Sequence, residues 1–168
     1  MARQWLIVRN LSISFVHNGV VIEADDCSTF LVRHAWLSMR AVVAEALTAH
    51  ELSVAQFASL MILDREPGLS VADVARKVGS ARQSANEMLA GLERAGLIER
   101  RPHPTDRRVQ QFQLTDAGRE RLAAARPTVR AVEQRLSAGF APEQLAAVNA
   151  WLTRMAAASS AAEEIPTL

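Results

Sequence analysis

The arginine-rich segment at residues 100–108 limits most strongly what this chain can fold into. Four of its nine residues are arginines, and prolines 102 and 104 exclude a helix because proline lacks a backbone N–H group. Burying four guanidinium groups would carry a large desolvation cost, so the segment must face solvent or an anionic partner. Apolar residues alternate on both sides of it, at 97–101 and 109–114, which predicts two strands joined by an exposed basic turn.

Residues 70–95, just upstream, have the pattern of two short helices separated by a glycine. Ser70 is followed three residues later by Asp73, the spacing of a capping box, and Gly79 ends that helix. Ser80 with Gln83 predicts a second capping box, which opens a helix of roughly 14 residues. Helix, turn, helix and basic hairpin, in that order, indicate a winged helix-turn-helix that binds DNA.

Further helices are predicted on both sides of this unit, from about residue 28 to 49, from residue 53 and from residue 115. In the last of these, apolar residues recur every seven positions, as in a coiled coil: Leu122, Val129 and Leu136. A final helix after Pro142 has an apolar stripe formed by Leu145, Val148, Leu152 and Met155. The two stripes either pack within one chain or form the contact between two chains.

The first 27 residues differ from the rest. They contain apolar runs of strand length, and Asn18-Gly19 is a strong hairpin-turn signal. This region is either a β-hairpin or a loosely packed upstream extension. The predicted division is therefore an extension at 1–27, outer helices at 28–52 and 116–160, and a DNA-binding domain at 53–115.

The charge distribution favours an anionic partner for one window of the chain. Residues 76–108 carry eight basic residues against four acidic ones, although the whole chain has a net charge of only +1. A single cysteine, Cys27, excludes an intrachain disulfide and suits the reducing cytoplasm. We expect no membrane span and no secretion signal, since no apolar run approaches the ~20 residues that cross a bilayer.

The residue patterns do not predict an enzyme. We find no nucleophile constellation, glycine-rich phosphate loop or paired-carboxylate motif. The histidines, at positions 17, 34, 50 and 103, are scattered singly without the spacing of metal ligands. The chain is therefore expected to use neither a cofactor nor a metal.

From about residue 28 to 158 the sequence resembles the MarR family of transcriptional regulators. The similarity is most specific in the string LERAGLIERR, in Asp106-Arg107-Arg108, and in Leu114-Thr115 with Gly118. It implies a mainly α-helical fold with a small β-wing, in which the N- and C-terminal helices interlock as a homodimer. It also implies that two winged helix-turn-helix units bind a pseudo-palindromic operator in double-stranded DNA, most often as a repressor.

The residues expected to contact DNA lie on the second helix of the unit and on the wing. On the helix they are Ser80, Arg82, Gln83, Ser84, Asn86 and Glu87. Gln83 and Asn86 can bond adenine edges, Arg82 a guanine edge or a phosphate, and the serines phosphates. Glu87 repels phosphate, and either accepts from a cytosine amino group or tethers a neighbouring arginine. On the wing they are Arg101, Asp106, Arg107 and Arg108; the resemblance implies that Asp106 orients Arg108 for the minor groove.

Two hypotheses address regulation. The resemblance implies release of DNA on binding a small effector, and Arg33, His34, Trp36, Met39 and Arg40 form a candidate site for an aromatic or anionic one. Alternatively, Trp36 and Met39 fill core space. The second hypothesis is a redox-responsive repressor that senses through Cys27, because the resemblance places Cys27 close to the reactive cysteine of a peroxide-sensing branch of the family. Against it, Asp25 and Asp26 would raise the pKa of the Cys27 thiol. A protein-interaction module without DNA binding is a further alternative.

Overall fold

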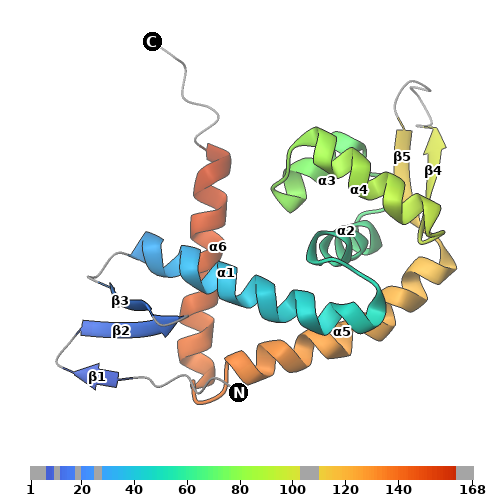
Figure 1. Ribbon diagram of the computed structural model, residues 1–168. Coiled ribbons are helices and arrows are strands. Elements are labelled where there is room, and N and C mark those ends of the chain that lie inside the picture. Colours follow the sequence, from blue (N-terminus) through green and yellow to red (C-terminus); the bar gives the residue numbers. More distant parts are fainter. Residues whose placement is uncertain (1–6, 10–11, 18–19, 25–27, 103–109, 162–168) are drawn as a thin grey trace, which may run out of the picture.

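A computed structural model describes residues 7–9, 12–17, 20–24, 28–102 and 110–161 of the 168-residue chain. The helices are α1 (Ser28–Leu47), the 3₁₀ turn η1 (Thr48–His50), α2 (Val54–Arg65), α3 (Val71–Val78), α4 (Arg82–Arg94), α5 (Asp116–Leu136) and α6 (Pro142–Ala161). The strands are β1 (Ile7–Arg9), β2 (Ser12–His17), β3 (Val20–Ala24), β4 (Ile98–Pro102) and β5 (Gln110–Leu114). Figure 1 shows α2, α3, α4 and the β4–β5 hairpin grouped at one end, with α1 and α5 running beneath them.

The main apolar core lies under α4, where α2, α3, β5 and α5 meet. Its largest fully buried side chains include Phe112, Leu60, Leu63, Leu89 and Leu92. Burying one leucine side chain contributes about 1.5–3 kcal/mol, so these residues hold α4 firmly against the rest of the unit. The predicted mainly α-helical fold with a small β-wing is confirmed.

The wing is a two-stranded antiparallel sheet with Ile98 opposite Leu114 and Pro102 opposite Gln110. Its inner end is tied to the turn after α2, because Gly68 N–H donates to the Phe112 carbonyl and Phe112 N–H donates to the Leu69 carbonyl, each at 2.9 Å. These bonds fix the wing relative to the helices. The turn at 103–109 lies outside the described residues.

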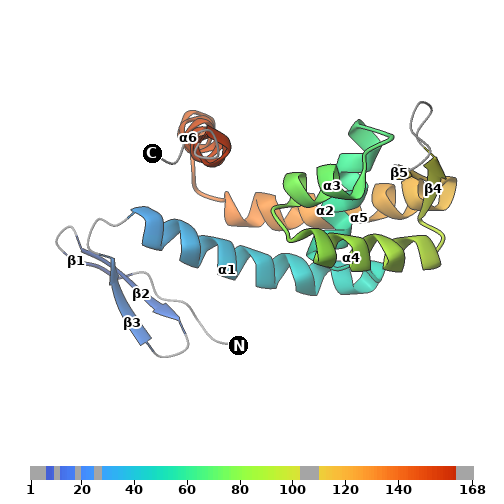
Figure 2. The ribbon, with the colours of Figure 1, turned by 90° about the horizontal axis from the view of Figure 1, so that it is seen from above.

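The seven-residue stripe on α5 packs mostly within this chain. Leu122, Val129 and Val132 are buried, and α5 lies along α1 and α2 (Figure 2). Only its last member, Leu136, is exposed, at 49%. Of the two alternatives, packing within one chain therefore holds for the buried part of the stripe, because α1 and α2 of the same chain cover it.

The last helix has no such partner. Among the described residues, α6 makes no extensive contact with another element, and Figure 2 shows it end-on and apart from α1. Its large apolar side chains Val148, Trp151 and Leu152 are 41–47% exposed, and Phe140 just before it is 58% exposed. α1 likewise exposes Phe30, Trp36, Leu37 and Met39. Apolar surface of this extent normally marks a partner.

The N-terminal region contains a three-stranded antiparallel sheet in the order β1-β2-β3. His17 pairs with Val20, so β2 and β3 are antiparallel neighbours, as the hairpin prediction requires; the Asn18-Gly19 turn itself lies outside the described residues. β1 overlaps the first of the apolar runs, WLIV, and pairs with β2, so the sheet has one strand more than a hairpin. Among the described helices, none is by itself long and apolar enough to cross a membrane. The pair Ser28–His50 and Val54–Arg65, bent by 76°, meets that test together by length and composition.

Candidate nucleic-acid interface

The first helix of the helix-turn-helix, α3, begins at a complete capping box. The Ser70 hydroxyl accepts from Asp73 N–H at 3.3 Å, and the Asp73 carboxylate accepts from Ser70 N–H at 3.2 Å. The Ser70 hydroxyl also donates to that carboxylate at 2.6 Å. These bonds from Ser70, with help from Arg76, hold the pKa of Asp73 below its ordinary value.

We expect Ser70→Ala to lower the free energy of unfolding by about 1 kcal/mol, because the helix loses an N-cap. The acid dependence should change as well. The stability that the bonds of Asp73 contribute is present above its unfolded pKa of 3.8 and is lost as pH falls through the lower folded pKa. Urea unfolding from pH 5 downwards should therefore show a shallower loss of stability in Ser70→Ala than in the wild type. Ser84→Ala, an exposed serine within α4, is the control and should change stability little.

The turn between α3 and α4 does not have the second capping box that the sequence predicts. Gly79 ends α3 in the left-handed conformation, with φ of 67°, and Ser80 N–H donates back to the Ala75 carbonyl at 3.0 Å. The N-cap of α4 is Ala81, and no side chain caps this helix. Ser80 therefore belongs to the end of α3 and lies two residues before α4 begins. Because Gln83 does not form a capping box with Ser80, its side chain can bond another group.

The recognition helix α4 buries one face and exposes the opposite one. Ala85, Leu89 and Leu92 are fully buried, and Met88 is half-buried, with its sulfur accepting from the Ser59 hydroxyl at 3.2 Å. The predicted contact residues of this helix are all exposed: Arg82, Gln83, Ser84, Asn86 and Glu87. Gln83 Nε2 donates to Glu87 Oε1 at 3.2 Å. Among the described residues Glu87 forms no ion pair with an arginine, so its partner is an amide and not the arginine that the sequence suggested.

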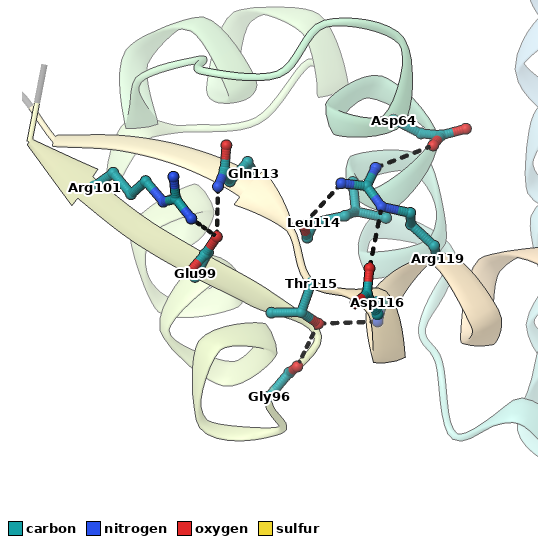
Figure 3. A network of polar contacts seen from close by, with 10 residues as sticks. Asp64, Gly96, Glu99, Arg101, Gln113, Leu114, Thr115, Asp116 and Arg119 are labelled. Atoms are coloured by element: carbon teal, nitrogen blue, oxygen red, sulfur yellow. Dashed lines mark hydrogen bonds and ion pairs between the residues drawn. The ribbon is translucent and has the colours of Figure 1, made fainter. Parts of the chain in front are cut away.

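The wing carries an ordered polar cluster at its base (Figure 3). Arg101 donates to Glu99 at 2.7 Å, and Gln113 on the opposite strand donates to the same carboxylate. The bond from Gln113, together with Arg101, holds the pKa of Glu99 below its ordinary value. Arg101 is 62% exposed, so a guanidinium held by Glu99 stands at the outer end of β4. Arg100 lies over the Phe112 ring at 5.2 Å and pairs with Glu93 on α4 at 3.0 Å.

The remaining predicted wing residues, Asp106, Arg107 and Arg108, lie outside the described residues. Sequence reasoning overlooked the contribution of Glu99 and Gln113 to the wing. The sequence offers only a weak signal, since Gln113 stands between Phe112 and Leu114 but its pairing with Glu99 depends on the strand register.

A second network joins the wing to α5. The Thr115 hydroxyl caps α5 by accepting from Gly118 N–H at 3.0 Å, and it donates to the Gly96 carbonyl at 2.7 Å, just past the end of α4 (Figure 3). Arg119 donates to the Leu114 carbonyl at 3.3 Å and lies within 4.0 Å of Asp64 on α2. These contacts join the start of α5 to the end of the recognition helix α4, to β5 of the wing and to α2.

Known proteins match this arrangement. Residues 52–109 match the model of the MarR family. The HTH-type transcriptional repressor Rv2887 of Mycobacterium tuberculosis is 33% identical over 123 residues, which cover 72% of this chain and 88% of the relative. The chain belongs to the MarR family. It is accordingly a transcriptional regulator and not an enzyme, as the sequence predicted.

Solved MarR-family structures agree with this assignment. A transcriptional repressor, CouR, bound to a 23-mer DNA duplex has a TM-score of 0.73 and 30% identity, over 78% of this chain and 93% of that one. A complex of the Mycobacterium tuberculosis protein Rv2887 with p-aminosalicylic acid has a TM-score of 0.64 and 28% identity, over 76% and 97%. Both matches leave part of this chain uncovered.

The residues predicted to bind an effector all lie on α1. Trp36 and Met39 are 50% and 41% exposed, so they do not fill the core of this chain, and Arg33 and Arg40 are exposed near them. His34 is half-buried with its ring 4.3 Å from that of Phe30. Cys27 lies outside the described residues. Among the described residues, no cluster of His, Cys, Asp and Glu could hold a metal ion.

A hollow of about 500 Å³ lies elsewhere, beside η1, the end of α4 and the start of α5. It contains none of the predicted effector residues. Arg121 lines it and is already bonded to the His50 carbonyl at 2.7 Å and to Glu51 at 3.0 Å. We assign no ligand to it.

Proposed function

We propose that this protein is a homodimeric, cytoplasmic repressor that binds a pseudo-palindromic operator and releases it when a small effector binds. The observation that carries the proposal is the exposed polar face of α4 beside a wing on which the exposed guanidinium of Arg101 pairs with Glu99. Amides and guanidinium groups on a helix of this kind match the base edges and phosphates of a major groove. The wing arginines beyond Arg101 suit a narrow minor groove.

The exposed apolar faces of α1 and α6 support the dimer. A second copy of this chain would cover these faces and place the two recognition helices about one turn of DNA apart. A two-fold symmetric operator requires that geometry. The face of α1 that carries Arg33, Trp36 and Arg40 would then border the dimer contact. An aromatic carboxylate bound there would contact the Trp36 ring and an arginine guanidinium. Its binding would change the spacing of the two recognition helices.

Selection from a random pool of DNA duplexes, followed by sequencing, tests the proposal. We expect an inverted repeat to be enriched, and we expect its affinity to fall steeply as salt concentration rises. A pool that stays random after several rounds of selection would contradict the proposal, and would favour a module that binds protein.

Arg108→Ala should weaken binding to the selected operator at least tenfold, or by about 1.4 kcal/mol, because the wing loses an arginine. The slope of log affinity against log salt should become shallower by about one unit, since one cation that neutralises a phosphate is removed. An electrophoretic shift titration at several salt concentrations measures both quantities. Arg130→Ala removes an exposed arginine from α5 and should leave both unchanged. If Arg108→Ala and the wild type bound the operator with equal affinity, Arg108 would not be part of the DNA interface.

A further inference from the structure

Gln83 and Glu87 form a bonded pair on the exposed face of α4, in the N-terminal half of the helix. They are one helical turn apart, and Gln83 Nε2 donates to Glu87 Oε1 at 3.2 Å. Both side chains are exposed, and Glu87 takes part in no ion pair with any other described residue. Its negative charge therefore remains uncompensated on a surface proposed to meet DNA.

The carboxylate decides which way the Gln83 amide faces. A free glutamine can present either its oxygen or its nitrogen to a base, because a rotation by half a turn exchanges the two. An ionised carboxylate has only acceptors, so it binds the nitrogen of Gln83 and rejects the oxygen. Gln83 Oε1 is consequently left to face outwards together with the Glu87 oxygens.

The outward surface of the pair is thus rich in acceptors. In the major groove, adenine N6 and cytosine N4 are donors, whereas guanine N7 and O6 and thymine O4 are acceptors. An acceptor surface bonds the first two groups and repels the others. Since phosphates also repel Glu87, the carboxylate lowers affinity for every duplex and recovers the loss only where it meets an amino group.

We propose that Gln83 and Glu87 act as one unit that determines operator specificity by accepting from the exocyclic amino group of an adenine or cytosine in the major groove. Glu87 is the positioning residue and also a second acceptor. The inference rests on the proposed function, because it requires that α4 enters the major groove. It adds the chemical class of base that the first turn of this helix selects.

The test compares the wild type with Glu87→Gln, in which the shape is kept but the charge and the fixed amide orientation are removed. We expect Glu87→Gln to bind random-sequence duplex more tightly and to lose about tenfold of its discrimination at one base pair of each half-site. A merely structural role would not move these two quantities in opposite senses. Glu133→Gln, an exposed acid on α5, controls for the change of net charge.

Base analogues then identify the group that is read. Replacing the base at that position by an analogue without the amino group, 2-pyrimidinone for cytosine or purine for adenine, should weaken wild-type binding about tenfold. The same replacement should cost Gln83→Ala and Glu87→Ala nothing further. Loss of binding on removing guanine N7 from the same pair instead, by 7-deazaguanine, would overturn the inference.

A failure of operator binding and a failure of the Gln83–Glu87 role give different results. If the wild type selects no sequence, both the operator-binding function and this inference are wrong. If the wild type selects an operator and Glu87→Gln selects it with the same discrimination at every base pair, only the inference is wrong.

Discussion

Gly118→Ala is expected to lower the free energy of unfolding by about 3 kcal/mol or more, because the added methyl group has no space. A Cβ built at Gly118 would lie 1.9 Å from the Leu97 carbonyl oxygen and 2.9 Å from its carbon. The obstacle is backbone, so no side-chain rotation can relieve it. Leu97 cannot withdraw, because its carbonyl accepts from Thr115 N–H at 3.1 Å, and its N–H donates to the Leu92 carbonyl at 3.0 Å.

The clash would also disturb the link between α5 and the end of the recognition helix. Gly118 N–H is the donor that the Thr115 cap requires, and Thr115 joins α5 to the end of α4. For a chain of this size, 3 kcal/mol corresponds to a fall in Tm of about 6–12 °C, which differential scanning calorimetry resolves.

Gly91→Ala is the matched control for this substitution. Gly91 is an interior residue of α4, and the nearest atom to a Cβ there, Gln56 Nε2, is at an ordinary contact distance of 3.8 Å. Alanine favours a helix interior over glycine by about 0.5–1 kcal/mol, so this variant should be as stable as the wild type or more so. If Gly118→Ala matched Gly91→Ala, the close approach of α5 to Leu97 would be refuted.

Trp151→Glu is expected to raise the dissociation constant of the homodimer at least about 100-fold. Removing an aromatic anchor from an interface centre costs about 2–4 kcal/mol, and a buried unpaired carboxylate adds to that cost. Trp151 is 43% exposed within one chain, next to Leu152 and Val148 on the face of α6 that lacks a partner. Sedimentation equilibrium over a range of concentrations measures the constant directly.

Operator binding should weaken when the dimer dissociates. In the dimer, one DNA-binding unit bound to its half-site holds the second unit at a high effective concentration near the other half-site, and separate monomers lack this advantage. Ala150→Glu adds the same charge to the side of α6 opposite its apolar stripe and should leave the dimer intact. A Trp151→Glu protein that still sediments as a dimer would show that α6 is not the contact between chains.

Short-range patterns predicted the winged unit well. The capping box at Ser70, the left-handed Gly79 and the alternation in β4 and β5 each depend on residues close in sequence, and each is present in the structure. The box at Ser80 was a false match, since the same serine is recruited by its backbone to end α3. Two competing local signals so close together cannot be ranked from spacing alone.

Patterns that join distant segments were less informative. A seven-residue repeat marks an apolar stripe but not the surface that covers it, and the α5 stripe from Leu122 to Val132 is covered by α1 and α2 of the same chain. The close approach of Gly118 to Leu97 spans two elements and has no sequence signature beyond the glycine itself. The role of Glu87 was equally undecided until its distance from Gln83 was known.

By itself the sequence determined the order of helices and wing, the basic hairpin and the apolar faces, because caps, turns and hydrophobic periods act over a few residues. Only the tertiary structure decided which apolar faces meet one another and which remain exposed, and which hydrogen-bond partner each exposed polar side chain has. Those choices depend on contacts between residues far apart in the chain, which packing and register determine together.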